Sequence, residues 1–269
     1  MDKKIGFIGC GNMGEAMLSG ILKANLVPAE NIMISRTSES TLKELKNKYD
    51  VNASLNNKDV AAFSDILILA VKPNKYIKVI KEIKAAVKKD VLIVSIAAGI
   101  TIETIEKAFE KDIKIVRSMP NTPALVGEAM SALTPSELVS PQELKEALSI
   151  FESFGKAEVI DENLMDMIPS VSGSSPAYVF MFIEALADGA VLRGMPRDKA
   201  YKFAAQAVLG AAKMVLETGE HPGSLKDKVC SPGGTTIEAV YSLEANNFRA
   251  SIIAAMESCT KKAEEMSKK

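Results

Sequence analysis

Histidine, cysteine and aromatic residues are scarce in this chain of 269 residues. It contains one His, three Cys and no Trp, and aromatic residues make up only 5% of the composition. The single histidine, His221, lies in the turn-like stretch Gly-Glu-His-Pro-Gly. No cluster of His, Cys and acidic residues has the spacing of a metal site. The sequence therefore indicates neither a bound metal nor a catalytic histidine.

Paired cysteines, an excess of one charge and a long apolar run are also missing. Cys10, Cys230 and Cys259 form no pair at metal-ligand or redox spacing, which favours a reducing compartment. Lys and Arg (33) nearly balance Asp and Glu (34), so a nucleic-acid partner has little support. The most apolar helical stretch contains Glu184 and Asp188 and is too short to span a bilayer. We expect a soluble, cytoplasmic protein with no membrane or nucleic-acid partner.

The first part of the chain alternates short apolar runs with helical segments. The runs that read as buried strands are residues 4–9, 31–35, 65–71, 91–97 and 113–119. Such alternation predicts βαβ units and a parallel sheet covered on both faces. A helix is expected at Pro141, because Ser140 can cap it and Glu143 can complete a capping box.

From Glu162 onward almost every segment has helical period, and no run reads as a strand. Two long Ala-rich helices end at Gly194 and Gly219. More apolar helical face is present than a five-helix bundle alone could bury. An internal core is one interpretation of this face, but exposed apolar patches of that size are uncommon on monomers. We therefore favour a helical dimer interface.

A glycine fingerprint follows the first expected strand directly and opens a helix. Gly9 permits the tight turn, Gly11 lets the backbone approach a pyrophosphate, and Gly14 allows the helix to pack on the sheet. The helix N-terminus then offers unpaired N–H groups to the diphosphate. The sequence thus predicts a Rossmann-like NAD(P)-binding domain over residues 1–162, followed by an all-α dimerisation and substrate domain over residues 163–269.

The end of the second strand predicts which dinucleotide binds. An NAD site usually places Asp or Glu there, but this chain has Ser35, Arg36 and Thr37, with no acid before Glu39. A guanidinium can pair with the 2′-phosphate of NADP, so we favour NADP over the alternative of a solvated arginine. The loops at 70–73, 95–99 and 118–123 follow other strands and either line the nicotinamide crevice or serve as turns.

A second loop, Cys-Ser-Pro-Gly-Gly-Thr-Thr, opens a helix near residue 235. Unpaired N–H groups there, with the hydroxyls of Ser231, Thr235 and Thr236, would suit a carboxylate. The alternatives are a simple helix cap and a second phosphate loop, although the Lys-Ser/Thr of a P-loop is missing. Cys230 next to it is either a thiol of lowered pKa or a packed side chain. Reducing a C=N bond suits this chain because a protonated imine accepts hydride without a strong general base.

Eight motifs, in order along the chain, closely resemble those of pyrroline-5-carboxylate reductases. They are FIGCGNMGEAM, AVKP, SIAAG, MPNTP, SGSSPAY, ALADGAVLRGMPR, QAVLGAAKM and LKDKVCSPGGTTIEAV, and they extend over nearly the whole chain. The resemblance implies NAD(P)H-dependent reduction of 1-pyrroline-5-carboxylate to L-proline, the last step of proline synthesis. NADPH is the expected cofactor and NADH the alternative. The resemblance also implies a helical domain that interlocks a homodimer, with rings of dimers in some members.

The resemblance carries over to individual positions. Thr236 matches the threonine thought to hydrogen-bond the ring nitrogen, and Glu162 matches an acidic position near the substrate. The residues expected at the substrate are Glu162, Lys228, Ser231, Gly233, Gly234, Thr235 and Thr236. With the motifs above, the residues expected at the nucleotide are Ile8, Gly9, Cys10, Gly11, Asn12, Met13, Gly14, Ser35, Arg36, Thr37, Asn57, Ala70, Val71, Lys72, Pro73, Ile96, Ala97, Ala98, Asn121 and Pro123. The chain departs from the family pattern at Lys228, in place of Asn, and at Ser175, in place of Gly.

Three other interpretations compete with this one. A β-hydroxyacid dehydrogenase would need a catalytic Lys where the stretch SVSGSSPAYVFMFIEA has none. Reductases of related imino acids, including six-membered rings, remain open. A non-catalytic NADP-sensing dimer would bind nucleotide without turning over an imine, and it would leave the loop from Ser231 to Thr236 without a purpose.

Overall fold

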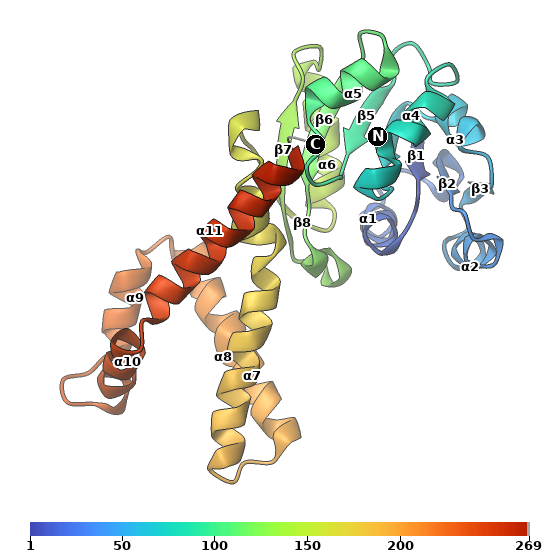
Figure 1. The fold of residues 1–269 in the computed structure, drawn as a ribbon. Coiled ribbons are helices and arrows are strands. Elements are labelled where there is room, and N and C mark those ends of the chain that lie inside the picture. The colour runs from blue at the N-terminus through green and yellow to red at the C-terminus, as the bar shows by residue number, and fades with distance from the viewer. Residues whose placement is uncertain (268–269) are drawn as a thin grey trace. The chain divides into compact units, whose positions relative to one another are not determined.

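The computed structural model describes residues 1–267, which fall into two compact units. The sheet unit comprises Met1–Ser174 and the segment that begins at Cys259, and the helical unit comprises Ser175–Ser258. The chain thus leaves the sheet unit once and returns to it inside the last helix (Figure 1). The sequence places a single boundary at 162/163 instead, and that boundary stays a prediction about the domains.

The sheet unit is built on eight strands in the order β3-β2-β1-β4-β5-β6-β7-β8. The strands are β1 (Ile5–Ile8), β2 (Ile32–Ser35), β3 (Asn52–Ser54), β4 (Ile66–Leu69), β5 (Leu92–Ser95), β6 (Lys114–Met119), β7 (Ala129–Pro135) and β8 (Gly155–Val159). All neighbouring strands run parallel except β6 and β7, which are antiparallel. The central strands β1, β4 and β5 are buried along their whole length, as strands covered on both faces must be.

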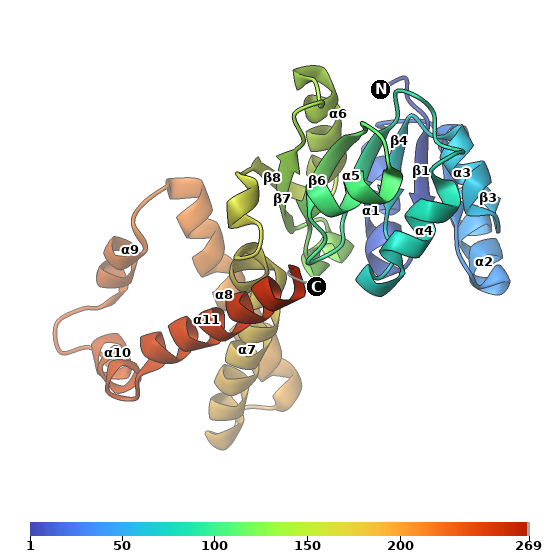
Figure 2. The same ribbon diagram turned by 45° about the horizontal axis from the view of Figure 1, so that its top comes forward.

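Helices cover both faces of this sheet (Figure 2). The helices of the sheet unit are α1 (Asn12–Lys23), α2 (Glu39–Tyr49), α3 (Asn57–Phe63), α4 (Tyr76–Ile83), α5 (Ile102–Phe109) and α6 (Pro141–Glu152), with short helical turns η1 (Ala29–Asn31), η2 (Pro73–Lys75), η3 (Thr122–Val126), η4 (Glu162–Leu164) and η5 (Pro169–Gly173). Apolar residues of α1, α2 and α6 form one core on one face, and those of α3, α4 and α5 form a second core on the other. The glycine loop and the other strand ends therefore sit on a rigid framework.

The predicted Rossmann-like architecture is confirmed. Five strands lie where the apolar runs place them, and the capping box at α6 is present: the N–H of Glu143 donates to Ser140 Oγ at 3.3 Å, and the N–H of Ser140 donates to Glu143 Oε2 at 2.9 Å. The five predicted strands run parallel, and β7, which is not among them, runs antiparallel to β6. The connection from β6 is short and contains only η3, so the chain turns back beside β6 without a crossover helix.

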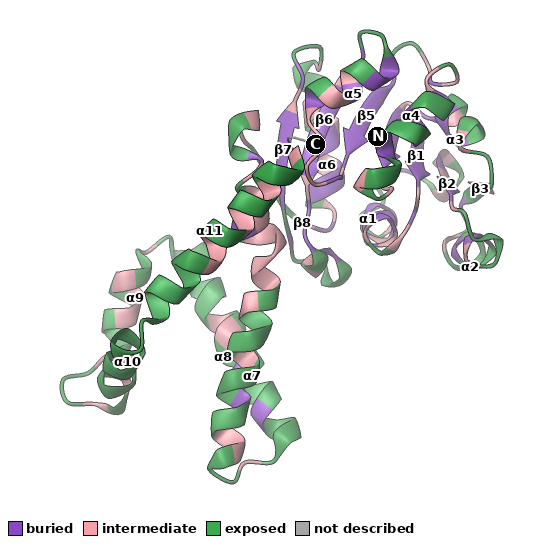
Figure 3. Cartoon of the chain, viewed as in Figure 1, coloured by how far each residue is buried: buried purple, intermediate pink, exposed green. Residues whose placement is uncertain are grey.

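The helical unit contains no strand among the described residues. Its helices are α7 (Ser175–Leu192), α8 (Arg197–Thr218), α9 (Pro222–Val229), α10 (Thr235–Ala245) and the first part of α11 (Phe248–Ser267). Many large apolar side chains are exposed on it, among them Phe180, Met181, Phe203, Leu216 and Tyr241, and green predominates over pink on its helices in Figure 3. Such faces fit an interface with a second chain.

The expectation that the stretch with Glu184 and Asp188 is too short to span a bilayer is wrong, because the segment that contains it, Pro169–Leu192, is long and apolar enough to cross a membrane by length and composition alone. A single helix of this kind is weak evidence for a membrane protein, since core helices of soluble proteins and signal sequences pass the same test. Most of this segment is α7, whose apolar side chains belong to the exposed face described above.

Candidate nucleotide and substrate sites

The glycine loop between β1 and α1 has the shape that a diphosphate needs. Gly9 has φ +85°, and a Cβ there would lie 2.4 Å from Val71 Cγ1, so only glycine fits. At Gly11 a Cβ would meet nothing closer than 3.8 Å, which leaves the backbone open to a ligand. No described side chain caps α1 at Gly11, so its first N–H groups are available. The residues present therefore fit the pyrophosphate of a dinucleotide.

Arg36 lies beside this loop. Its Nη1 donates to the carbonyl oxygen of Cys10 at 3.1 Å, and its other N–H donors remain for a ligand at the end of β2. The Cys10 side chain is buried, and burial together with the Glu15 carboxylate raises its pKa to about 12. The thiol therefore stays neutral, and Cys10 contributes its backbone rather than its sulfur to the site.

Ser35 and Asn57, both predicted at the nucleotide, hydrogen-bond each other. The Ser35 hydroxyl donates to Asn57 Oδ1 at 2.7 Å, and Asn57 Nδ2 donates to Glu82 Oε2 at 3.3 Å. Ser35 is buried, whereas Thr37 is exposed. The sequence reasoning missed Glu82, because its link to this site depends on α4 lying beside the start of α3.

The other predicted nucleotide loops follow β4, β5 and β6 at the same edge of the sheet. Parallel strands bring their carboxyl ends together, which is where dinucleotides bind in such folds. The residues are Ala70, Val71, Lys72 and Pro73 after β4, Ile96, Ala97 and Ala98 after β5, and Asn121 and Pro123 after β6. Asn121 is buried, and its amide is already used, accepting from the N–H of Met130 and donating to the carbonyl of Ser172, each at 2.9 Å. It anchors its loop.

Glu162 lies at the end of the linker that leaves β8, and its carboxylate is engaged within the sheet unit. Its Oε1 accepts from the N–H of Ile102 at 2.9 Å and from Nη1 of Arg117 at 3.1 Å. The Arg117 side chain is only 5% exposed, and its Nη2 also donates to Asp166 Oδ1 at 2.8 Å. The sequence reasoning named Glu162 but missed Arg117 and Asp166.

The predicted substrate loop lies in the helical unit and forms a tight turn before α10. The N–H of Gly234 donates to the carbonyl of Ser231 at 3.0 Å, Pro232 occupies the second position and Gly233 the third with φ +66°. These are the features of a type II turn. A Cβ at Gly234 would lie 2.4 Å from Ser231 Oγ, so a side chain there would displace that hydroxyl.

The N-terminus of α10 is uncapped by any described side chain. The first N–H groups of a helix have no partner within it, and here they lie beside the hydroxyl of the exposed Thr235 and that of the half-buried Thr236. Lys228, predicted near the substrate, forms an ion pair with Glu220 at 2.5 Å instead, across α9. The arrangement provides neutral donors for a small anion.

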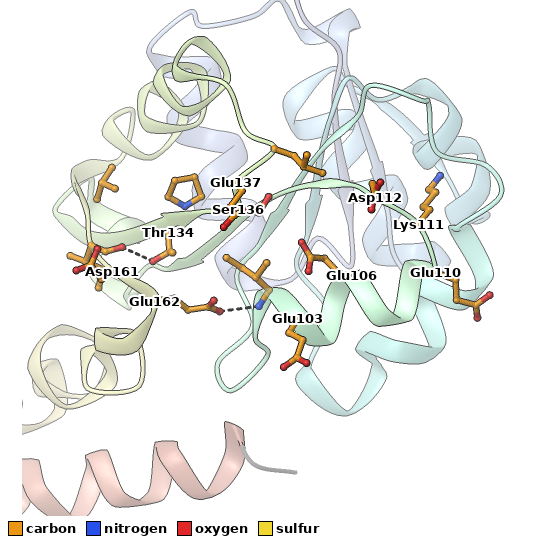
Figure 4. A pocket seen from close by; sticks show the side chains of 15 residues that line it. Glu103, Glu106, Glu110, Lys111, Asp112, Thr134, Ser136, Glu137, Asp161 and Glu162 are labelled. Atoms are coloured by element: carbon orange, nitrogen blue, oxygen red, sulfur yellow. Dashed lines mark hydrogen bonds between the residues drawn. The ribbon is translucent and has the colours of Figure 1, made fainter.

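A large open hollow of about 1170 Å³ lies elsewhere on the sheet unit, between α5 and the ends of β7 and β8 (Figure 4). Acidic residues line it: Glu103, Glu106, Glu110, Asp112, Glu137, Asp161 and Glu162, with Lys111 the one basic residue of its described lining. Negative charge of this density would repel phosphates. The lining of this hollow therefore does not fit a dinucleotide.

This fold and the glycine loop define the class of NAD(P)-dependent oxidoreductases with a nucleotide-binding sheet and a helical second part. Residues 4–99 match the family described as NADP oxidoreductase, coenzyme F420-dependent. Residues 162–266 match the family described as pyrroline-5-carboxylate reductase dimerisation. These matches confirm the predicted fold class and the predicted kind of cofactor.

Relatives that match along the whole chain identify the family more narrowly. Pyrroline-5-carboxylate reductase of Escherichia coli (strain K12) is 55% identical over 268 residues, covering 100% of both chains. The solved structure of the Coxiella burnetii pyrroline-5-carboxylate reductase has a TM-score of 0.94 at 35% identity and covers 100% of both chains. That of the Plasmodium falciparum pyrroline carboxylate reductase with NADP bound has a TM-score of 0.89 at 34% identity and covers 99% of this chain and 98% of that one. The chain belongs to the pyrroline-5-carboxylate reductase family, and it is an oxidoreductase.

Proposed function

We propose that the protein reduces the C=N bond of 1-pyrroline-5-carboxylate to L-proline with NADPH, as the last step of proline biosynthesis. Family membership supports the reaction. The observation that carries the site assignment is the uncapped N-terminus of α10, whose first turn contains Thr235 and Thr236 and whose preceding turn contains Ser231. A small carboxylate is the ligand that such neutral donors and a helix dipole favour.

The chain contributes binding and orientation. The first turn of α1 and the open backbone at Gly11 hold the diphosphate, and Arg36 favours the 2′-phosphate of NADPH over the free hydroxyl of NADH. Ser231, Gly234 and Thr235 hold the substrate carboxylate, and Thr236 hydrogen-bonds the ring nitrogen. Bound nicotinamide supplies the hydride. No strong base is required, because the proton is already on the imine or reaches it through the Thr236 hydroxyl or water.

The remaining predicted site residues form part of the same proposal. Those at the nucleotide lie in the glycine loop and in the loops after β2, β4, β5 and β6, with Ser35 and Asn57 acting as a linked pair and Asn121 as an anchor. Glu162 and Lys228 lie at the edge of the substrate site and act through their ion-pair partners. The helical unit forms a homodimer through its exposed apolar face, with rings of dimers as a further level of assembly, and the enzyme works in the cytoplasm.

A spectrophotometric assay at 340 nm tests the reaction. Purified protein is mixed with 1-pyrroline-5-carboxylate and either NADPH or NADH, and the six-membered cyclic imine is run in parallel. We expect rapid oxidation of NADPH and slower turnover with NADH and with the larger ring. Tight nucleotide binding without turnover of any imine would overturn the proposal and favour an NADP-sensing dimer. Faster turnover with NADH would overturn only the assignment to Arg36.

Two substitutions test the role of Thr236. Thr236→Val keeps the volume but removes the hydroxyl, and we expect kcat to fall roughly 10- to 1,000-fold, as for loss of one positioned donor. Thr236→Ser keeps the hydroxyl and should retain most of kcat. NADPH affinity, measured by calorimetry, should be unchanged in both. If Thr236→Val loses nucleotide binding together with rate, the residue supports the fold of the helix start instead.

A further inference from the structure

The loop between β5 and α5, residues 96–101, is held at both ends by hydrogen bonds from other parts of the sheet unit. At its start, the Ser118 hydroxyl donates to the carbonyl of Ser95 at 2.8 Å. At its end, the N–H of Ile102 donates to Glu162 Oε1 at 2.9 Å. This loop contains three of the residues predicted at the nicotinamide, Ile96, Ala97 and Ala98.

The last turn of α11 lies against the middle of this loop. Gly99 has φ +73°, and a Cβ there would lie 3.2 Å from Met266 Cβ and 3.3 Å from the Met266 carbonyl carbon. The contact involves the backbone of the helix, so a flexible side chain could not move away to relieve it. Gly99 is thus required both by its conformation and by the approach of α11.

A cluster of the buried Arg117 with the half-buried Glu162, Asp166 and Ser267, called here the Arg117 cluster, ties that turn to the start of α5. Arg117 donates to both carboxylates, at 3.1 and 2.8 Å, and the Ser267 hydroxyl donates to Asp166 Oδ1 at 2.8 Å. A guanidinium that is 5% exposed is fixed in one place by such pairing. The cluster therefore links the end of the loop, through Glu162, to the end of α11, through Asp166.

Little free space remains between the loop and its support. The cavity that they share, lined by Ala97, Ala98 and Gly99 on one side and by Arg117 and Asp166 among others on the other, measures about 10 Å³. That is about the smallest volume that can hold one water molecule. The loop is therefore packed closely against the cluster and α11.

We propose that the Arg117 cluster and the Met266–Ser267 turn position the nicotinamide half of the cofactor by holding the 96–101 loop. Arg117 is then a positioning residue that acts through Glu162, and α11 is part of the cofactor site. This inference rests on the proposed function, which places the nicotinamide at Ile96–Ala98. Disturbing the support should impair the nicotinamide half, whereas the adenosine half, held at α1 and β2, should not respond.

A matched pair of glycine substitutions tests this proposal. Gly99→Ala and Gly127→Ala both put a side chain at positive φ, +73° and +78°, but no described atom lies within 4 Å of a Cβ at Gly127. Calorimetry gives the Kd of each variant for NADP⁺ and for adenosine 2′,5′-bisphosphate, which lacks the nicotinamide. For Gly99→Ala we expect weaker NADP⁺ binding, unchanged bisphosphate binding, and a kcat roughly 10- to 100-fold lower, as for a displacement of about 1 Å. Gly127→Ala should leave all three unchanged.

The proposal would be overturned if Gly99→Ala lowered the affinity for NADP⁺ and for the bisphosphate equally, or lowered neither. Ser267→Ala provides a second test if Gly99→Ala fails to fold, because it removes only the hydroxyl that joins α11 to Asp166. It should lower kcat severalfold without changing KM for the imine or the melting temperature, and an unchanged kcat would count against the proposal. A wild-type protein that binds bisphosphate but turns over no imine would contradict the proposed function and not this inference.

Discussion

Replacing Arg36 with glutamine tests the proposed preference for NADPH over NADH. The guanidinium uses one N–H on the carbonyl of Cys10 at 3.1 Å and keeps others for a 2′-phosphate. A hydrogen bond to a charged group contributes about 1.5–3 kcal/mol, and about 1.4 kcal/mol corresponds to a tenfold change in affinity. NADP⁺ affinity should therefore fall roughly 10- to 150-fold, nearer the lower figure because Arg36 is partly exposed. NAD⁺ affinity should change by about twofold or less.

Calorimetry with NADP⁺ and NAD⁺ at low and high salt measures this difference. The chain has no Trp, so the emission of bound NADPH can be followed as a second signal without tryptophan overlap. Arg36→Lys keeps the charge without the planar fork and should give an intermediate NADP⁺ affinity. The difference in NADP⁺ affinity between the wild type and Arg36→Gln should be smaller at high salt, because salt screens partly exposed charges.

The hydrogen bond from Arg36 to the Cys10 carbonyl suggests an alternative role for Arg36, which predicts a different result. If Arg36 serves mainly to hold the glycine loop, Arg36→Gln should lower the affinity for NADP⁺ and the affinity for NAD⁺ by the same factor. Arg36→Lys, which still reaches a carbonyl, would then restore both. That result would refute the argument for a phosphate-binding arginine and leave the cofactor preference without its expected cause.

Two further predictions concern stability. Gly155→Ala would place a Cβ 2.2 Å from a backbone carbonyl oxygen of β7. The melting temperature should therefore drop by an amount that corresponds to about 3 kcal/mol or more. An unchanged melting temperature would contradict the strand register. The hydrogen bond from Lys48 lowers the pKa of Glu15 below its usual 4.5, so this pair stabilises the fold above about pH 4.5 and the contribution is lost as the pH falls below that value. Urea unfolding of Glu15→Gln should therefore show a loss of a few tenths of a kcal/mol at pH 7 that disappears near pH 3, and a loss independent of pH would contradict it.

The central strands and the glycine loop could be predicted because their signals are local. A buried parallel strand needs a continuous apolar run, and residues 65–71 and 91–97 show one between polar residues. The capping box at Ser140 and Glu143 requires only two side chains three positions apart. The open backbone at Gly11 follows from the spacing of the fingerprint.

The outer strands could not be predicted, because their sequences lack that signal. β7 reads Ala-Met-Ser-Ala-Leu-Thr-Pro and β8 reads Gly-Lys-Ala-Glu-Val, with few β-branched residues and with charges in β8. They become strands because each pairs with a neighbour, β7 with β6 and β8 with β7. Propensity is a weak guide where pairing of this kind decides the structure.

Only part of the Arg117 cluster could be predicted from the sequence. An arginine inside the apolar run from 113 to 119 signals a partner, since a charged side chain is almost never fully buried unpaired. The partners themselves are 45 and 49 residues further along the chain, and nothing in the sequence specifies Glu162 and Asp166 among many acids. The role of Glu162 came from a family resemblance, which gives a position but not its contacts.

The return of α11 to the sheet unit has a consequence for how the protein is made. Gly99 and Met266 are 167 residues apart, and ribosomes add about 5–20 residues per second. Roughly 8 to 33 seconds therefore separate the synthesis of the 96–101 loop from the arrival of the turn that packs against Gly99. During that interval the 96–101 loop lacks one of its contacts. A chain terminated early would carry an intact glycine fingerprint and an unsupported loop, so full cofactor binding would report that translation had reached residue 267.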